Sequence, residues 1–97
     1  MVRMTLEFSG EIIYWRGPSP YYFVAVPPEQ SSDIKAISGL VTYGWGCIPA
    51  AARIGATEYK TSLFPRNGGY VVPVKDAVRK AEALGQGDVV AVRLEIR

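Results

Sequence analysis

The chain has 97 residues, of which 48% are hydrophobic and 21% are charged, and its formal net charge is +2. This length and composition predict a single globular domain, residues 1–97, and they exclude a disordered chain, because disordered segments are poor in apolar and aromatic residues. The small net charge does not by itself argue for a nucleic-acid-binding protein.

The chain has one cysteine, Cys47, so no disulfide can form within it. This usage is typical of a reducing compartment, and we expect Cys47 to be a small buried hydrophobe. The first twelve residues alternate instead of forming an apolar run, so we expect no signal peptide, and no run reaches the ~20 apolar residues of a membrane span. We therefore expect a cytoplasmic protein without membrane contacts.

Strand, turn and helix signals follow one another in the amino-terminal half. Residues 3–16 alternate with a period of two and predict a long strand that bends or bulges near Gly10. A Gly/Pro-rich turn at 17–20 leads to a strand at 21–26, which two prolines end. Ser31 or Ser32 is expected to cap a short helix that ends at Gly39, and residues 47–54 predict a third strand after an aromatic loop at 42–46.

The carboxy-terminal half gives the same kinds of signal. Residues 57–64 predict a strand, residues 65–69 a glycine-containing turn, and residues 70–74 a buried strand interrupted at Pro73. Residues 75–84 have helical apolar spacing, with Gly85 expected as the left-handed residue after the helix. Residues 89–96 alternate and predict a last strand with a charged, solvated outer face.

Both halves run in the order strand, proline, short helix, glycine, strand. A twofold repeat of this kind predicts a small pseudosymmetric β-barrel with helices that cap its ends. The alternative is that any strand needing a sharp exit uses a proline, in which case the repeat has no structural meaning.

The sequence resembles the DUF1905 family, whose pattern is a Thr-Ser-Leu strand, a Gly-Tyr turn, Pro-Val-Lys, Val-Arg-Lys and Gly-Asp. The matching positions are Thr61, Ser62, Leu63, Gly69, Tyr70, Pro73, Val74, Lys75, Val78, Arg79, Lys80, Gly87 and Asp88, with Phe8, Gly10, Trp15, Val26, Pro27, Ile54 and Gly55 in the first half. The resemblance covers nearly the whole chain. It implies a mostly β, double-split β-barrel with two short helices, and a function that is not assigned.

A second set of residues resembles the half-unit of AbrB/MazE-type swapped-hairpin DNA-binding proteins, in which two short chains build one barrel. The residues are Pro73, Arg79, Leu84, Gly87 and Asp88 with the strand that follows. Here both halves lie in one chain, so we expect a monomer. This departure and the uncharged, alanine-rich run at 49–52 argue against DNA binding, because a fold alone does not carry a function.

Catalysis is not favoured by the residues present. The chain has no histidine and a single cysteine, so the commonest general base, a Cys-His pair and the ordinary zinc ligand sets are missing. The carboxylates are scattered without calcium-site spacing, and we expect neither a metal nor a cofactor. Ser62 with Lys60 or Lys75 would be a Ser-Lys pair, but Ser62 and Lys60 merely share a strand face.

The sequence instead predicts an anion site within one hairpin-plus-helix unit. Its residues are Lys60, Ser62, Arg66, Lys75 and Arg79, and Trp45, between two glycines, is a candidate for the pocket mouth. The alternatives are that Lys75 and Arg79 pair with Glu58, Asp76 or Asp88, or solvate a helix face, and that the indole of Trp45 covers a barrel end. The leading hypothesis is a non-catalytic domain that binds a small anionic or aromatic ligand. The alternative function is a nucleic-acid or protein interaction module that uses the same basic face.

Overall fold

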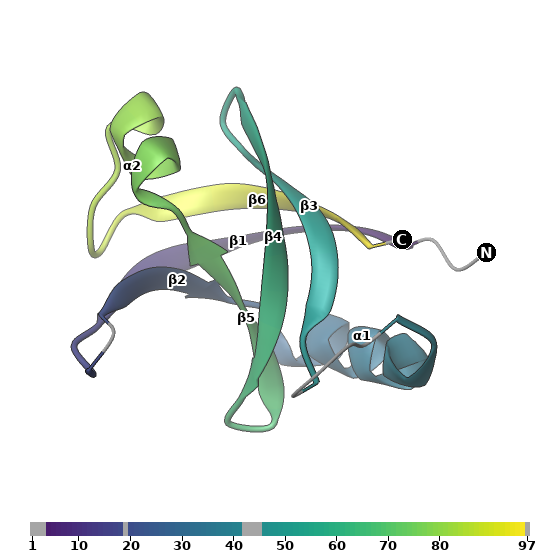
Figure 1. The fold of residues 1–97 in the computed structure, drawn as a ribbon. Helices are drawn as coiled ribbons and strands as arrows, with labels where there is room; N and C mark the ends of the chain where they lie inside the picture. Colours follow the sequence, from purple (N-terminus) through teal and green to yellow (C-terminus); the bar gives the residue numbers. More distant parts are fainter. Residues whose placement is uncertain (1–3, 19, 42–45, 97) are drawn as a thin grey trace.

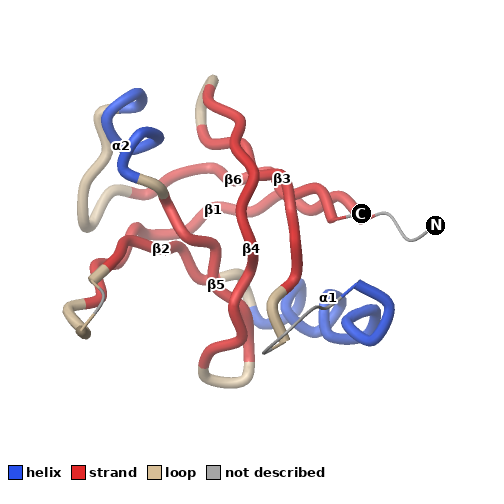
Figure 2. The backbone as a smooth tube through the Cα atoms, viewed as in Figure 1, coloured by secondary structure: helices blue, strands red, loops and turns tan. Residues whose placement is uncertain are grey.

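The computed structural model describes residues 4–18, 20–41 and 46–96. The described chain forms six strands and two helices: β1 (Met4–Trp15), β2 (Tyr21–Ala25), α1 (Pro28–Val41), β3 (Ile48–Ile54), β4 (Thr57–Arg66), β5 (Gly69–Val74), α2 (Asp76–Glu82) and β6 (Val89–Ile96). Strands dominate the structure, and the two helices lie on opposite sides of it (Figures 1 and 2).

The strands close into a barrel in the order β1, β2, β5, β4, β3, β6. Two long strands, β1 and β4, each pair with one neighbour along their first part and with another along their second part. β1 pairs with β6 from Met4 to Glu11 and then with β2 from Ile12 onward. In the same way, β4 pairs with β3 up to Leu63 and then with β5 from Phe64. These two changes of partner make the barrel double-split, and they confirm the predicted fold class.

The repeat in the sequence is also a repeat in the topology. In each half, a long strand pairs with the strand that follows it, a helix comes next, and a last strand joins the other half. The repeated order of strands and helices is therefore present in the topology. The two prolines are not equivalent, however, since Pro27 follows β2 whereas Pro73 lies within β5.

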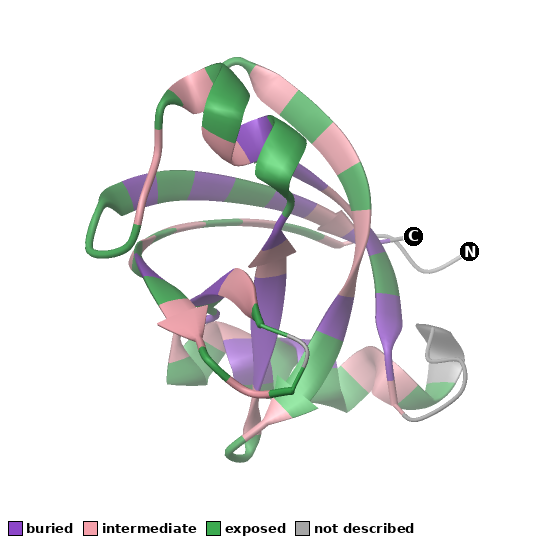
Figure 3. Cartoon of the chain, turned by 60° about the vertical axis from the view of Figure 1, so that its left-hand side comes forward, coloured by how far each residue is buried: buried purple, intermediate pink, exposed green. Residues whose placement is uncertain are grey.

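The core lies inside the barrel, because alternate residues of each strand point inward. Along β6, for example, Val90, Val92, Leu94 and Ile96 are buried, and the residues between them are more exposed. Figure 3 shows this alternation as changing colours along the strands. β3 has the same pattern, with Ala50 and Ala52 buried beside larger aliphatic residues, and Cys47 is buried as expected.

Gly10 stands next to the point where β1 changes partner. A Cβ atom at this position would lie 2.6 Å from Cγ1 of Val24 on β2. Real Cβ contacts do not come so close, so only glycine lets β1 pass this near to β2. The predicted bend near Gly10 thus corresponds to the change from β6 to β2.

Helix α1 begins earlier and ends later than predicted. It starts at Pro28 and continues through Gly39 to Val41. Proline suits the first turn of a helix because its missing N–H would have no partner there, so the two prolines both end β2 and start α1. Ser31 is therefore not a cap; its hydroxyl donates to the Val26 carbonyl and accepts the Tyr70 N–H, which joins α1 to β5.

The β4–β5 hairpin has a shorter turn than the predicted residues 65–69. Only Asn67 and Gly68 form the turn, both with positive φ (50° and 78°), which is the geometry of a two-residue type I′ turn. Pro73 does not interrupt β5, since the strand runs through it and Pro73 pairs with Phe23. The β4 ladder on β5 reaches only to Val71, so Pro73 lies beyond it.

Helix α2 is shorter than predicted and ends without glycine. Ala83 takes the left-handed conformation (φ 54°, ψ 50°), and the Leu84 N–H donates to the Arg79 carbonyl. Gly85, the expected left-handed residue, instead donates its N–H to the Asp88 carboxylate. Neither helix in the described ranges is long and apolar enough to cross a membrane.

Candidate functional site

A hollow of about 550 Å³ lies where the start of α2 meets the end of the β1–β2 hairpin. We call it the α2 pocket, and it is lined by Tyr14, Pro20, Tyr21, Tyr22, Val74, Lys75, Asp76 and Arg79. Tyr14 and Tyr22 are directly opposite each other on β1 and β2, with ring centroids 4.7 Å apart. The pocket thus has aromatic walls, two cations and one carboxylate, so its local charge is positive.

Arg79 is the most confined charged group of the α2 pocket. Its guanidinium carbon lies 3.8 Å from the centroid of the Tyr22 ring, and its side chain is 21% exposed. Nη2 donates to Oδ1 of Asp76 at 2.9 Å, so the ion pair with Asp76 considered in the sequence is present. Nε is buried and has no hydrogen-bond partner in the described chain. The fold therefore fixes the guanidinium while using little of its capacity to donate hydrogen bonds.

Lys75 precedes α2 and lies beside a half-buried tyrosine. Its Nζ atom is 6.0 Å from the centroid of the Tyr59 ring. The Tyr59 hydroxyl donates to the Pro73 carbonyl at 2.8 Å. Burial raises the pKa of the Tyr59 hydroxyl well above its ordinary value, because it disfavours the phenolate. Tyr59 therefore stays neutral and holds the strand end from which Lys75 projects.

Arg66 lies at the other end of β5. This strand has 6 residues and at ~3.3 Å per residue spans about 20 Å, with Arg66 paired to its first residue and Lys75 following its last. The Arg66 guanidinium carbon is 5.0 Å from the centroid of the Phe23 ring and 5.6 Å from that of Trp15. Arg66 and Lys75 therefore belong to two different sites.

Lys60 and Ser62 lie on a third part of the surface. They are opposite Ala51 and Pro49 on β3, because β4 turns to β5 only after Leu63. Lys60 is exposed and lines a small hollow of about 270 Å³, and Ser62 is half-buried. Trp45 lies outside the described residues. Of the six residues named from the sequence, the structure thus brings Lys75 and Arg79 into one pocket.

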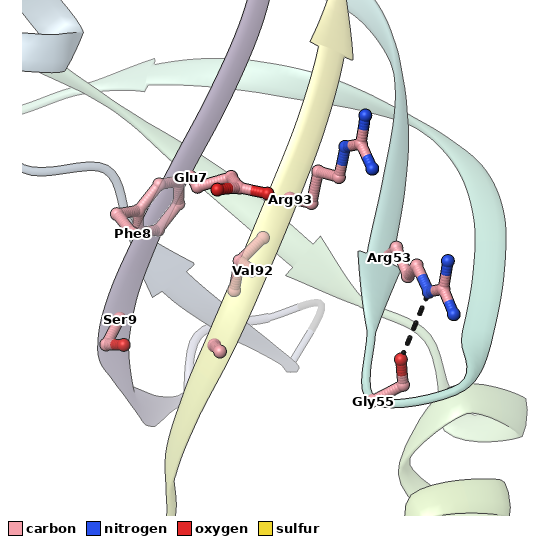
Figure 4. A pocket seen from close by; sticks show the side chains of 8 residues that line it. Glu7, Phe8, Ser9, Arg53, Gly55, Val92 and Arg93 are labelled. Atoms are coloured by element: carbon pink, nitrogen blue, oxygen red, sulfur yellow. Dashed lines mark hydrogen bonds between the residues drawn. The ribbon is translucent and has the colours of Figure 1, made fainter.

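A further hollow of about 660 Å³ on the outer face of β1, β6 and β3 was not anticipated (Figure 4). Arg93 and Arg53 are directly opposite each other on β6 and β3, and Arg93 is also opposite Glu7. Arg53 donates to the Gly55 carbonyl and lies 3.8 Å from Glu58. Glu7 on β1 and Glu58 on β4 balance the charges of the two arginines, so this face is less positive than the α2 pocket.

The sequence also missed the tyrosines that wall the α2 pocket. Alternation alone places Tyr14 and Tyr22 on the inward side of their strands, but only the β1–β2 register shows that they meet. No signal in the sequence gives that register, because the hairpin turn at 17–20 has no fixed two-residue type.

The fold and these pockets define a small, internally repeated β-barrel domain, and among the described residues no three His, Cys, Asp or Glu side chains are grouped to hold a metal. The family model described as "Domain of unknown function (DUF1905)" matches residues 8–94, so the chain belongs to this family. No curated protein matches the chain. The description of the family assigns no activity.

Proposed function

We propose that the protein is a non-catalytic binding domain whose α2 pocket holds a small anion, either a carboxylate or a phosphate, by Arg79 and Lys75. The observation that carries this proposal is the state of Arg79: its guanidinium is stacked at 3.8 Å on Tyr22, is mostly buried, and makes one hydrogen bond, to Asp76. A cation already held in place loses little side-chain entropy when it binds an anion.

The charge and shape of the pocket favour this class of ligand. Hydrogen bonds to charged groups are stronger than neutral ones, and a guanidinium can bind a carboxylate or phosphate through two parallel N–H groups. Lys75 adds a second cation, so the pocket keeps a net positive charge although it also contains the Asp76 carboxylate. The tyrosine walls offer flat apolar faces, which favour an anion attached to a planar group.

The same residues give little support to catalysis. The chain has no histidine, and Cys47 is buried and does not line the α2 pocket. Binding, in contrast, needs only the shape and charge described above. The basic residues are also divided among three places, which favours a small ligand over a nucleic acid or protein bound to one broad basic face.

The proposal is tested by calorimetric titration with inorganic phosphate, benzoate and a short DNA duplex. We expect phosphate or benzoate to bind the wild type, and Arg79→Gln to weaken that binding by about tenfold or more, because a hydrogen bond to a charged group contributes about 1.5–3 kcal/mol. Lys75→Gln, at an exposed position, should weaken it too without disturbing the Arg79–Asp76 pair.

Lys80→Gln is the matched control, because Lys80 is exposed on the same helix and does not line the pocket. Circular dichroism of each variant checks that it is folded. Equal binding by wild type and Arg79→Gln would contradict the proposal. Preferential binding of DNA, with an affinity that falls steeply as salt rises, would replace it by the nucleic-acid alternative.

A further inference from the structure

We propose a second binding site, around Arg66, for a small molecule that combines a flat apolar body with one carboxylate or phosphate. The site is a hollow of about 510 Å³ that we call the aromatic groove, and the residues that line it include Ile13, Phe23, Arg66, Asn67, Gly69 and Val71. It lies at the opposite end of β5 from the α2 pocket and shares no lining residue with it.

The floor of the groove is an apolar surface outside the barrel core. Phe23 and Val71 are buried, yet neither belongs to the core cluster, because Val24 and Val72 occupy the inward side of the same strands. On β6, by contrast, the outer face carries Arg93 and Glu95. The outer face of β2 and β5 is thus apolar at the groove, where that of β6 is charged.

Exposed apolar side chains extend this floor. Ile13, opposite Phe23 on β1, is 41% exposed, and Phe64, opposite Val71 on β4, is 42% exposed. Of the large hydrophobic residues that are exposed in the described chain, only Val89 lies elsewhere. Apolar surface that water reaches is favourable to cover, and here it gathers around one hollow.

Arg66 gives the groove its charge. It is half-buried against Phe23 and Trp15, and it is the one charged residue among those that line the groove. No carboxylate of the described chain forms an ion pair with it. A guanidinium stacked on aromatic rings keeps its N–H edge free for an acceptor, so Arg66 is placed to bind an anion that enters the groove.

Together these features select one kind of ligand. The volume lies within the range of about 300–1,000 Å³ typical of small-molecule sites, and such sites combine apolar walls with a few polar groups. A phosphate alone would leave the apolar floor uncovered, and a nucleic acid would need several cations along its path, where this groove has one. An acid that carries an aromatic ring can cover the apolar side chains with its ring and bind Arg66 through its acid group.

The test uses 2-naphthoate, its neutral analogue 2-naphthamide, and acetate, titrated into the full chain and followed by backbone amide NMR shifts. We expect 2-naphthoate to shift the amides of Asn67–Gly69 with an affinity at least about tenfold higher than that of either of the other two compounds. Shifts at Lys75–Arg79 report binding of the same aromatic carboxylate in the α2 pocket and are fitted separately. Arg66→Gln should reduce the binding of 2-naphthoate at Asn67–Gly69 to the level of 2-naphthamide.

Arg79→Gln serves as the reciprocal control, and it should leave the binding of 2-naphthoate at the groove unchanged. This variant also separates the two sites, since the α2 pocket depends on Arg79 and the groove on Arg66. Equal binding of naphthoate and naphthamide, or shifts confined to the α2 pocket, would overturn the proposal. Concentration-dependent dimerisation that Ile13→Ser abolishes would also overturn it, by showing that a second copy covers the groove.

Discussion

At the scale of single residues, Tyr59 connects the core to the α2 pocket. Its hydroxyl donates to the Pro73 carbonyl where β4 no longer pairs with β5, and its ring lies beside Lys75. The side-chain hydrogen bond from Tyr59 thus links β4 to β5 at a point where the two strands share no backbone ladder. Because the phenol is largely surrounded by protein, its neutral form is the one compatible with the fold.

We predict that Tyr59 makes the protein less stable in alkali. The pKa of its hydroxyl is raised by folding above the ordinary value near 10, so its contribution is complete below pH ~10 and is lost as the pH rises beyond that value. Tyr59→Phe should lower the free energy of unfolding by about 1 kcal/mol at pH 7, through the lost hydrogen bond, but should flatten the decline above pH ~10.

Urea unfolding of wild type and Tyr59→Phe between pH 7 and pH 11 measures both effects. Tyr21→Phe controls for the removal of a tyrosine as such, since Tyr21 lies across the α2 pocket and is not bonded to Pro73. Identical alkaline slopes for wild type and Tyr59→Phe would show that the raised pKa has no effect on stability.

At the scale of elements, the end of α2 is conformationally unfavourable. Ala83 adopts the left-handed conformation that glycine takes most readily, and an alanine there brings its Cβ close to a carbonyl oxygen. We predict that Ala83→Gly raises the free energy of unfolding by about 0.5–1 kcal/mol. Ala81→Gly, the same change at an exposed position inside the helix, should lower it by a similar amount. Urea unfolding of both variants gives the two signs, and destabilisation by both would contradict the assigned helix end.

The differences between predicted and observed elements have local physical causes. Alternation predicted the strands at 3–16, 47–54 and 89–96, because a strand with one wet face preserves the period of two. The strands at 21–26, 57–64 and 70–74 were predicted from β-rich runs between turn signals, and β2 and β5 do not alternate in burial. The ends of the helices were harder to place: Pro28 starts α1 where the sequence suggested only the end of a strand, and Ala83 ends α2 without the glycine signal. Helix propensity is a weak guide where contacts with neighbouring elements fix the backbone. At Ser31, the hydroxyl joins α1 to β5 through hydrogen bonds to Val26 and Tyr70 and does not cap the helix.

At the scale of the whole molecule, the closed barrel determines which part of the candidate site could be predicted from the sequence. Lys75 and Arg79 lie one helical turn apart, so their proximity follows from local structure. Arg66 and Lys60 were assigned to the same cluster, and their separation depends on β4 changing its partner at Phe64. That change is a property of the closed barrel, which no local pattern contains.

The two halves of the chain depend on each other for most of their strand pairing. Only the β1–β2 and β4–β5 ladders lie within a half, whereas the β1–β6, β2–β5, β3–β4 and β3–β6 ladders join residues 4–54 to residues 57–96. A hairpin without further strands is at best marginally stable in water. The internal repeat therefore describes two units that fold only together.

We predict that a chain cut between Gly55 and Ala56, in the turn that joins the halves, yields two fragments that are each unfolded alone and form the barrel when mixed. Backbone NMR spectra of a labelled fragment 1–55, recorded with and without unlabelled fragment 56–97, measure this directly. The stability of the mixture should rise with concentration, because folding has become an association. Cooperative urea unfolding by either fragment alone would contradict the prediction, since it would show that one hairpin and its helix make a sufficient core without the four ladders between the halves.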